Sequence, residues 1–436
     1  MKNPRYVAVE LLNKTFRSGS YSNIQLSSGL DASELSDKDK KLCSVIYYGV
    51  IERKITLDHI IGGLSSRPVN KLDDVVLNIL RCGIYQLLYM DAIPDNAAVN
   101  ESVALAKMFR KTSASGMINA ILRNFIRREK VYPVPMDILK SAEIMYSAPA
   151  WLVEDLCRDY DPERMRDLLS DALDKPPVTI RMNHLLCTED ELISSLGRIK
   201  AEKCDKIPGC WILSGGDPTS TDAFRKGYFH VQDRASQLCC MAVDPKENDR
   251  VLDICAAPGG KTFTMAEMMS GRGEIHAFDL HEKRVKLIKD GALRLGLENI
   301  KATAGDASKF NETLPKFTKI LCDVPCSGIG AIRRKPEIKY KNPEDFRNLP
   351  EIQYRIAENA LNYLEVGGEL IYSTCTLRRE ENDAVIDKLL ANHPELEPVS
   401  FLEELGCPFG ESYKASIFPM HFGSDGFFIS KIKKIK

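Results

Sequence analysis

The sequence has no long hydrophobic run and none of the extremes of composition that mark specialised protein classes. Of its 436 residues, 44% are hydrophobic and 28% are charged, which is ordinary for a soluble globular protein. No apolar stretch approaches the ~20 residues that a bilayer-spanning helix requires, and the first residues do not resemble a secretion signal. We therefore expect a cytoplasmic protein of two or three domains that does not contact a membrane.

The sequence also lacks the cysteine spacing of a metal site or a disulfide framework. Its 13 cysteines are an odd number and include no Cys-x-x-Cys pair, and only 7 histidines are present. Structural zinc sites need Cys or His ligands at short, regular spacing, and disulfides are rare in a reducing compartment. We expect free thiols and no bound metal.

Charge of one sign is not in excess overall, but it is unevenly distributed. The net charge is −1, while residues 1–140 hold 20 Lys and Arg against 14 Asp and Glu. A basic excess of this size fits a module that binds nucleic acid, and it fits a solvated helical surface equally well. Charge alone therefore leaves both possibilities open.

Hydrophobic spacing predicts that residues 1–130 form an all-helical bundle. Asn3 can cap a helix that has Pro4 at its first position, and a second helix is expected to begin at Ser36. Residues 72–89 then carry apolar side chains at helical spacing.

Three further segments follow the bundle. The two prolines in residues 131–135 mark a linker, and a short helical region is expected as far as residue 175. Residues 176–245 mix short strands and helices, which predicts a small α+β subdomain of RRM-like type. From residue 246 to residue 436, short apolar strands alternate with helices, which is typical of a parallel, doubly wound Rossmann-like sheet. The expected strands are residues 251–255, 274–278, 300–304, 319–323, 368–373 and 426–432, the last inserting antiparallel.

A turn of small residues lies between the first of these strands and a helix. Such a turn lets the backbone approach a ligand at the carboxyl edge of the sheet. The candidate cofactor loop comprises Cys255, Ala256, Ala257, Pro258, Gly259, Gly260 and Lys261. A dinucleotide, a P-loop nucleotide and S-adenosylmethionine compete for it. The dinucleotide pattern Gly-x-Gly-x-x-Gly is absent, and Cys255 stands where a P-loop needs its first glycine.

Two carboxylates follow the next strands in register with this loop. Asp279 ends the second strand, where an acidic side chain can accept hydrogen bonds from the ribose hydroxyls of a nucleoside. Asp306 follows the third strand and could face the adenine. Either residue alone could be an ordinary strand-end turn, but their common register favours a nucleoside site.

Two cysteines follow the fourth and fifth strands, Cys326 in a Pro-Cys sequence and Cys375 in a Thr-Cys sequence. A thiolate can add to C6 of a cytosine and thereby make C5 nucleophilic. A second thiol could remove the C5 proton or position a water that does so. Asp323, as a carboxylic acid whose pKa is raised by burial, could protonate or hydrogen-bond the N3 edge of the base. Cys322, inside the strand, is expected to be a small buried apolar side chain.

These motifs together resemble the RNA 5-methylcytosine methyltransferases. Residues 255–261 are similar to the cofactor loop of that family, 323–328 to its Pro-Cys motif and 372–376 to its Thr-Cys motif. The resemblance implies S-adenosylmethionine as cofactor, Cys375 as nucleophile and Cys326 as the residue that assists release. It also places one lysine and three carboxylates at the cofactor and the target base: Lys261, Asp279, Asp306 and Asp323.

The resemblance extends beyond the catalytic motifs. Residues 227–238 and 425–428 look like the family's segments before the catalytic fold and at its last strand, and residues 1–130 resemble the helical NusB-like domain. The fusion is similar to methyltransferases of the small ribosomal subunit, which implies 16S ribosomal RNA as partner. We expect the chain to act as a monomer. The same chemistry on transfer RNA, and a non-catalytic RNA-binding assembly factor, are the alternatives.

Two basic segments complete the sequence. Arg333, Arg334 and Lys335 follow the Pro-Cys motif, and we expect them to lie beside the active site and contact RNA phosphates. A solvated basic loop is the alternative. The lysine-rich run at residues 431–436 is expected to be a solvated tail.

Overall fold

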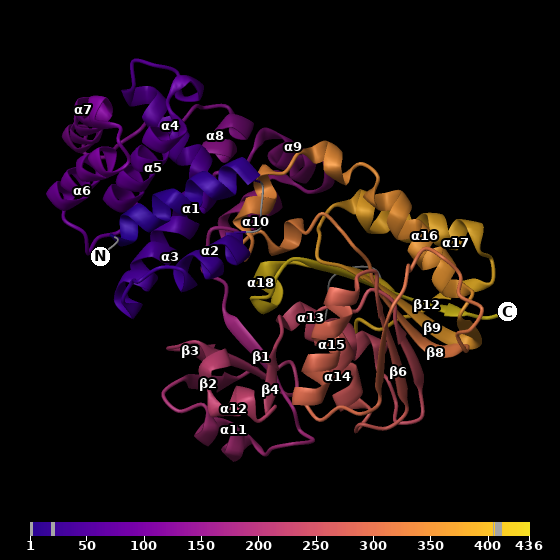
Figure 1. The fold of residues 1–436 in the computed structure, drawn as a ribbon. Coiled ribbons are helices and arrows are strands. Elements are labelled where there is room, and N and C mark those ends of the chain that lie inside the picture. Colours follow the sequence, from indigo (N-terminus) through magenta and orange to yellow (C-terminus); the bar gives the residue numbers. More distant parts are fainter. Residues whose placement is uncertain (1–2, 19–21, 404, 406–411) are drawn as a thin grey trace. The chain divides into compact units, whose positions relative to one another are not determined.

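The computed structural model describes residues 3–18, 22–403, 405 and 412–436. These residues fall into two compact units (Figure 1). The first unit comprises Met1–Asp174 with Ile332–Pro343, and the second comprises Lys175–Ala331 with Glu344–Lys436. The chain therefore leaves the second unit after Ala331 and returns to it at Glu344.

The first unit is a helical bundle, as the sequence predicts. Its helices are α1 (Pro4–Ser18), α2 (Ser22–Asp31), α3 (Asp37–Glu52), α4 (Lys54–Leu64), α5 (Asp74–Tyr89), α6 (Asp95–Met108), α7 (Ser115–Arg127), α8 (Ile138–Met145), α9 (Ala150–Asp159) and α10 (Pro162–Asp171). Asn3 accepts from the N–H of Arg5 at 2.9 Å, and Ser36 caps α3, so both predicted helix starts are confirmed. Every residue of α5 from Val76 to Ile84 is buried, which makes α5 the central helix of the bundle. No helix that the structure describes is long and apolar enough to cross a membrane.

Residues 332–343 complete this helical unit from a distant part of the sequence. The side-chain Nζ of Lys339 donates to the carbonyl of Glu52 at 2.9 Å, and the hydroxyl of Tyr340 donates to the carbonyl of Ile51 at 2.8 Å. These carbonyls end α3, where a helix has no backbone donors left for them. Lys339 is only 2% exposed, and its burial lowers the pKa of the amine to about 7.

This packing changes the domain to which Arg333, Arg334 and Lys335 belong. Residues 246–436 were expected to form one methyltransferase domain, whereas the segment with these three residues packs in the helical unit. The physical reason is the demand of the α3 carbonyls for donors, which leaves no trace in the local sequence. Their expected place beside the active site stays a prediction. Contact of these three residues with RNA stays a prediction as well.

The second unit contains a small antiparallel sheet and a large mixed sheet. The small sheet has the strand order β2-β3-β1-β4. Its elements are β1 (Val178–Met182), α11 (Glu189–Ser195), β2 (Lys200–Lys203), β3 (Cys210–Ser214), α12 (Asp222–Arg225) and β4 (Phe229–Val231). The predicted α+β subdomain is present.

The large sheet has the order β7-β6-β5-β8-β9-β12-β10, with β11 paired to β12. Its strands are β5 (Arg250–Asp253), β6 (Glu274–Asp279), β7 (Ile300–Ala304), β8 (Phe317–Asp323), β9 (Leu364–Thr374), β10 (Leu396–Pro398), β11 (Lys414–Ile417) and β12 (Phe427–Lys434). Strands β5 to β9 pair in parallel, and β12 is antiparallel to β9. The Rossmann-like fold with an antiparallel last strand is therefore confirmed.

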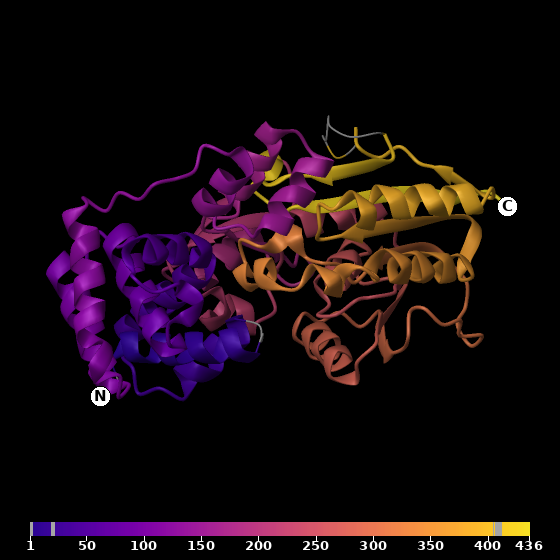
Figure 2. The same ribbon diagram turned by 90° about the horizontal axis from the view of Figure 1, so that it is seen from above.

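Helices cover both faces of this sheet (Figures 1 and 2). They are α13 (Arg234–Val243), α14 (Gly260–Met268), α15 (Glu282–Arg294), α16 (Leu349–Leu361), α17 (Asp383–Asn392) and the short α18 (Pro419–Phe422). One apolar core joins α13, α14 and α15 to the sheet, and a second joins α16 and α17 to its other face. Burial on both faces is what a parallel sheet requires.

The predicted solvated tail at residues 431–436 is wrong. Strand β12 continues to Lys434 and pairs with both β9 and β10. Lys431 is only 6% exposed, and its Nζ lies 3.0 Å from the carboxylate of Glu369 on β9. A lysine paired in this way can occupy a strand interior, and composition alone did not show the partner.

A buried polar cluster joins the small sheet to α14, the helix that follows the candidate cofactor loop. Arg181 on β1 pairs with Glu267 on α14 at 2.6 Å. The Nε2 atom of His230 on β4 lies 3.2 Å from the hydroxyl of Thr264, which donates to Gln232 at 2.6 Å. Burial lowers the pKa of His230 to about 3, so the folded unit holds this ring neutral.

We predict that His230 makes the second unit less stable in mild acid. The unfolded chain protonates this ring near its ordinary pKa of 6.5, whereas the folded chain resists down to about 3. The stability from neutral His230 is therefore complete above pH 6.5 and is lost as the pH falls toward 3, by up to about 1.4 kcal/mol per pH unit. Urea unfolding at pH 6.5, 5.5 and 4.5 should show a smaller acid loss for His230→Phe. The same substitution at exposed His184 is the control, and equal losses in wild type and His230→Phe would contradict the prediction.

Candidate functional site

The predicted site residues gather at one edge of the large sheet. Strands β5, β6, β7, β8 and β9 run parallel, so their carboxyl ends share this edge. The residues that end or follow these strands, in chain order, are Cys255 to Lys261, Asp279, Asp306, Asp323, Cys326 and Cys375. All belong to the second unit, whereas Arg333, Arg334 and Lys335 belong to the first.

The cofactor loop is fixed to the neighbouring strand by hydrogen bonds. The N–H of Ala256 donates to the carbonyl of Phe278 at 2.7 Å, and the N–H of Ala257 donates to a carboxylate oxygen of Asp279 at 3.3 Å. Arg284 binds both residues of the second hydrogen bond: its guanidinium lies 3.2 Å from the Asp279 carboxylate and donates to the carbonyl of Ala257 at 2.8 Å. Gly259 has φ of +111°, which favours glycine at the turn into α14. Asp279 thus shapes the loop and, with about four acceptor positions per carboxylate, keeps capacity for a ligand.

Asp306 lies on the wall of an open pocket. The pocket has a volume of about 500 Å³ and is also lined by Ile254 and Phe278, at the ends of β5 and β6. The Asp306 carboxylate accepts from the N–H and the hydroxyl of Ser308 and lies 3.0 Å from Lys309. The hydrogen bonds from Ser308 and Lys309 lower the pKa of this carboxyl, which keeps it an acceptor at neutral pH.

Lys261 and Asp323 form an ion pair between the cofactor loop and the end of β8. The Lys261 Nζ lies 2.7 Å from one oxygen of Asp323, and Ser373 donates to the other at 2.9 Å. Burial opposes the charge of Lys261, but the Asp323 carboxylate outweighs it and holds the pKa of the lysine above its usual value. Both oxygens of Asp323 therefore have partners at the edge of the sheet.

The two motif cysteines are in contact. The Sγ atoms of Cys326 and Cys375 lie 3.3 Å apart. The hydrogen bond with Cys375 and burial raise the pKa of Cys326 well above that of an ordinary thiol, so Cys326 stays protonated at neutral pH. Cys322, four residues earlier and inside β8, is fully buried, as expected for a small apolar side chain.

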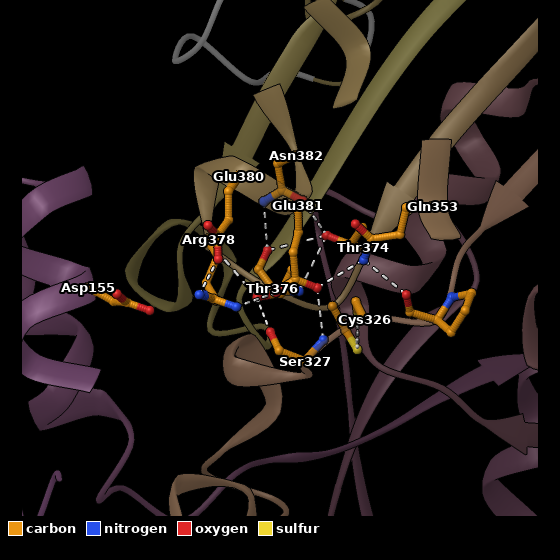
Figure 3. Close-up of polar contacts among 12 residues, drawn as sticks. Asp155, Cys326, Ser327, Gln353, Thr374, Thr376, Arg378, Glu380, Glu381 and Asn382 are labelled. Atoms are coloured by element: carbon orange, nitrogen blue, oxygen red, sulfur yellow. Dashed lines mark hydrogen bonds and ion pairs between the residues drawn. The ribbon is translucent and has the colours of Figure 1, made fainter. Parts of the chain in front are cut away.

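Sequence reasoning missed a set of buried polar residues that surrounds the cysteines (Figure 3). One Glu381 oxygen accepts from the N–H of Ser327 and from the side chain of Gln353, both at 2.9 Å. Asn382 accepts from the hydroxyl of Thr374 at 2.6 Å and donates to the carbonyl of Thr376 at 3.0 Å. The only sequence signal was the Glu-Asn pair shortly after the Thr-Cys motif, and Gln353 had none.

The described residues offer no grouping of three or more His, Cys, Asp or Glu side chains placed to hold a metal ion. All twelve cysteines within the described ranges are free thiols. The groups that the described residues place at the sheet edge include two thiols, an ion pair and hydrogen-bonding carboxylates.

We predict that a thiol oxidant joins the two motif cysteines. Their sulfurs, 3.3 Å apart, need only approach to the ~2 Å of a disulfide bond. Diamide, which takes up the two thiol hydrogens, should give a Cys326–Cys375 peptide link in tryptic mass spectra. Cys326→Ser is the control and should remove this link. Preferential pairing of either cysteine with Cys322 or Cys255 would contradict the geometry.

Three family profiles match successive parts of the chain. The profile described as 16S rRNA methyltransferase RsmB/F matches residues 240–433, and that of the NusB family matches residues 2–127. A ferredoxin-like domain of RsmF/B-like methyltransferases matches residues 148–218, so it begins earlier than the predicted α+β subdomain.

Full-length relatives show the same arrangement. A probable ribosomal RNA small subunit methyltransferase B of Bacillus subtilis is 38% identical over 99% of this chain and 98% of its own length. The crystal structure of PH0851 covers 100% of this chain and 99% of its own, with a TM-score of 0.82 and 24% identity. The structure of NSun6 from Pyrococcus horikoshii with SFG covers 66% of this chain and 98% of its own, with a TM-score of 0.60 and 21% identity. On the strength of the B. subtilis relative, the chain belongs to the RsmB family of ribosomal RNA methyltransferases.

Proposed function

We propose that this chain transfers a methyl group from S-adenosylmethionine to C5 of a cytosine in 16S ribosomal RNA, through a covalent bond between Cys375 and C6. The observation that carries the proposal is the 3.3 Å contact between Cys326 and Cys375 beside Asp323 at the cofactor edge. The B. subtilis relative is named for small-subunit ribosomal RNA, which supports the choice of RNA.

The donor set of the cofactor loop fits a nucleoside without phosphates. The two cations of the loop region are paired with carboxylates, Lys261 with Asp323 and Arg284 with Asp279. A P-loop lysine would instead reach a phosphate. Asp279 and Asp306 are acceptors suited to ribose hydroxyls and an adenine amine, and the pocket at Asp306 is open. NSun6 was solved with SFG, an analogue of S-adenosylmethionine. When bound, S-adenosylmethionine supplies an electrophilic methyl group on a positively charged sulfur.

The residues of the protein have separate roles in the remaining steps of the reaction. Cys375 adds as a thiolate to C6, which breaks the aromaticity of the ring and gives C5 the character of an enamine carbon. Electron density also builds at N3, which then needs a hydrogen-bond donor. Lys261 can donate an N–H to this edge, and Asp323 can serve it only as the carboxylic acid, with a proton taken from Lys261. After methylation C5 carries a proton that must leave before the C6–sulfur bond breaks. Cys326, a thiol held beside Cys375, can orient a water that takes this proton, and it can take the proton itself only as a thiolate, after its own proton has left.

The substrate must offer the base outside a stacked helix, because both cysteines have to reach one ring. We propose an RNA loop or a partly assembled small subunit as the target, with the chain acting as a cytoplasmic monomer. Arg333, Arg334 and Lys335 are the proposed phosphate contacts. Transfer RNA is the alternative substrate, and a non-catalytic assembly factor is the alternative class.

We predict opposite outcomes for loss of the two thiols. Cys375→Ala should abolish methylation, because nothing then adds to C6. Cys326→Ala should slow release by at least about tenfold and accumulate a protein–RNA adduct that survives denaturing electrophoresis. Full activity of Cys375→Ala, or absence of any adduct with Cys326→Ala on a good substrate, would reverse the assigned roles.

Bisulfite sequencing of RNA from cells with and without the gene tests the substrate. Loss of one protected cytosine in 16S ribosomal RNA is the expected result. Loss confined to transfer RNA would keep the chemistry and change the substrate. An unchanged methylation pattern would favour the assembly factor.

A further inference from the structure

Glu381 is a charged side chain with no exposure to solvent, 0%. A buried carboxylate is costly unless hydrogen bonds compensate for its lost hydration. Its partners come from separate parts of the chain: Ser327 after β8, Gln353 on α16 and Arg378 after β9, the last at 3.5 Å. A group that joins three segments in this way fixes their mutual positions.

The first of these segments carries Cys326. Glu381 accepts from the N–H of Ser327, the residue after Cys326, at 2.9 Å. Gln353, whose amide also bonds Glu381, donates to the carbonyl of Pro325, the residue before Cys326, at 2.9 Å. The backbone is therefore held on both sides of Cys326.

The same short segment holds Cys375. Glu381 ends the 3₁₀ helix η7 (Arg379–Glu381), and its carbonyl accepts from the hydroxyl of Tyr372 at 2.6 Å. The next residue, Asn382, bonds the hydroxyl of Thr374 and the carbonyl of Thr376. Thr374 and Thr376 flank Cys375. In Figure 3 the Glu381 side chain reaches Ser327 and Gln353, and that of Asn382 reaches Thr374 and Thr376.

We propose that Glu381 is a positioning residue for the release step: it holds Cys326 against Cys375 through Ser327 and Gln353. This inference rests on the proposed function, in which Cys326 assists release. Glu381 touches neither the base nor the cofactor in this role. Cys375 is held from the same segment through Asn382, so loss of the Glu381 carboxylate should disturb Cys326 more than Cys375.

The negative charge of Glu381 also affects the protonation of Cys326. After the hydrogen bond with Cys375 and burial, the neighbouring charges of Glu381 and Asp323 further raise the pKa of Cys326. A cysteine kept as a thiol does not compete with Cys375 for C6.

Glu381→Gln tests the inference, since it keeps the size of the side chain and removes its charge. One Glu381 oxygen accepts from Ser327 and Gln353 and the other from Arg378, so the amide N–H of glutamine must face the donors on one side. The bonds that remain also lose the assistance of the charge, so the Ser327 contact should loosen. The expected result on 16S RNA is at least about a tenfold lower kcat, accumulation of the denaturation-resistant adduct as in Cys326→Ala, and a rate of adduct formation within about twofold of wild type. If Glu381→Gln does not fold, Gln353→Met tests the same point, because it removes the bonds to both Pro325 and Glu381. It should likewise slow release more than adduct formation.

Glu380→Gln is the matched control. Glu380 precedes Glu381 on η7, its side chain is 47% exposed, and it pairs with Arg378. This variant should turn over without trapping the adduct. Wild-type turnover by Glu381→Gln, or an equal loss of adduct formation and release in folded Glu381→Gln and Gln353→Met, would overturn the positioning role.

Diamide cross-linking separates this inference from the proposed function, because it needs no RNA. Glu381→Gln should form the Cys326–Cys375 link at least about threefold more slowly than wild type and Glu380→Gln, even though loss of the Glu381 charge favours the Cys326 thiolate. If wild type methylates no cytosine, the proposed function fails while this rate still decides whether Glu381 positions the thiols. An unchanged rate would refute the positioning role.

Discussion

The parallel pairing of β8 with β9 is the constraint on which the site depends. In that register Asp323 lies opposite Ser373, so the loops that follow both strands leave the sheet side by side. Two cysteines far apart in the sequence, Cys326 and Cys375, then meet with sulfurs 3.3 Å apart. A slip of one residue would turn alternate side chains to the other face of the sheet and separate the thiols from the Lys261–Asp323 pair.

Buried polar contacts keep this edge in one arrangement. Parallel strands buried on both faces fix the backbone, but apolar packing tolerates small shifts of the loops beyond them. Hydrogen-bonded charges are more specific, because an unpaired buried group is costly. Lys261 with Asp323, Arg284 with Asp279, and Glu381 with its three donors therefore define the loops more sharply than the surrounding core does. The Arg181–Glu267 pair extends the same principle to the small sheet.

In the helical unit, a distant segment of the chain supplies hydrogen-bond donors to the end of a helix. The carbonyls that end α3 receive donors from Lys339 and Tyr340, which follow the Pro-Cys loop in the chain. The segment with Arg333, Arg334 and Lys335 therefore belongs to the helical unit, although the chain enters it directly from the Pro-Cys loop. Continuity along the sequence was a poor guide here, because helix ends take donors from wherever the chain supplies them.

The sequence by itself determined the bundle, the alternation of strands and helices, and the strand-end positions of the cofactor loop, Asp279, Asp306, Asp323 and the two cysteines. Each of these leaves a local signal, such as hydrophobic period, a cap at Asn3 or Ser36, or a motif next to a strand end. Only the tertiary structure decided that Lys431 lies inside a strand, that residues 332–343 join the helical unit, and that Glu381 and Gln353 bracket Cys326. The physical reason is that these placements depend on hydrogen bonds and ion pairs between segments far apart in the chain. The local sequence around one partner does not indicate which residue the other partner is.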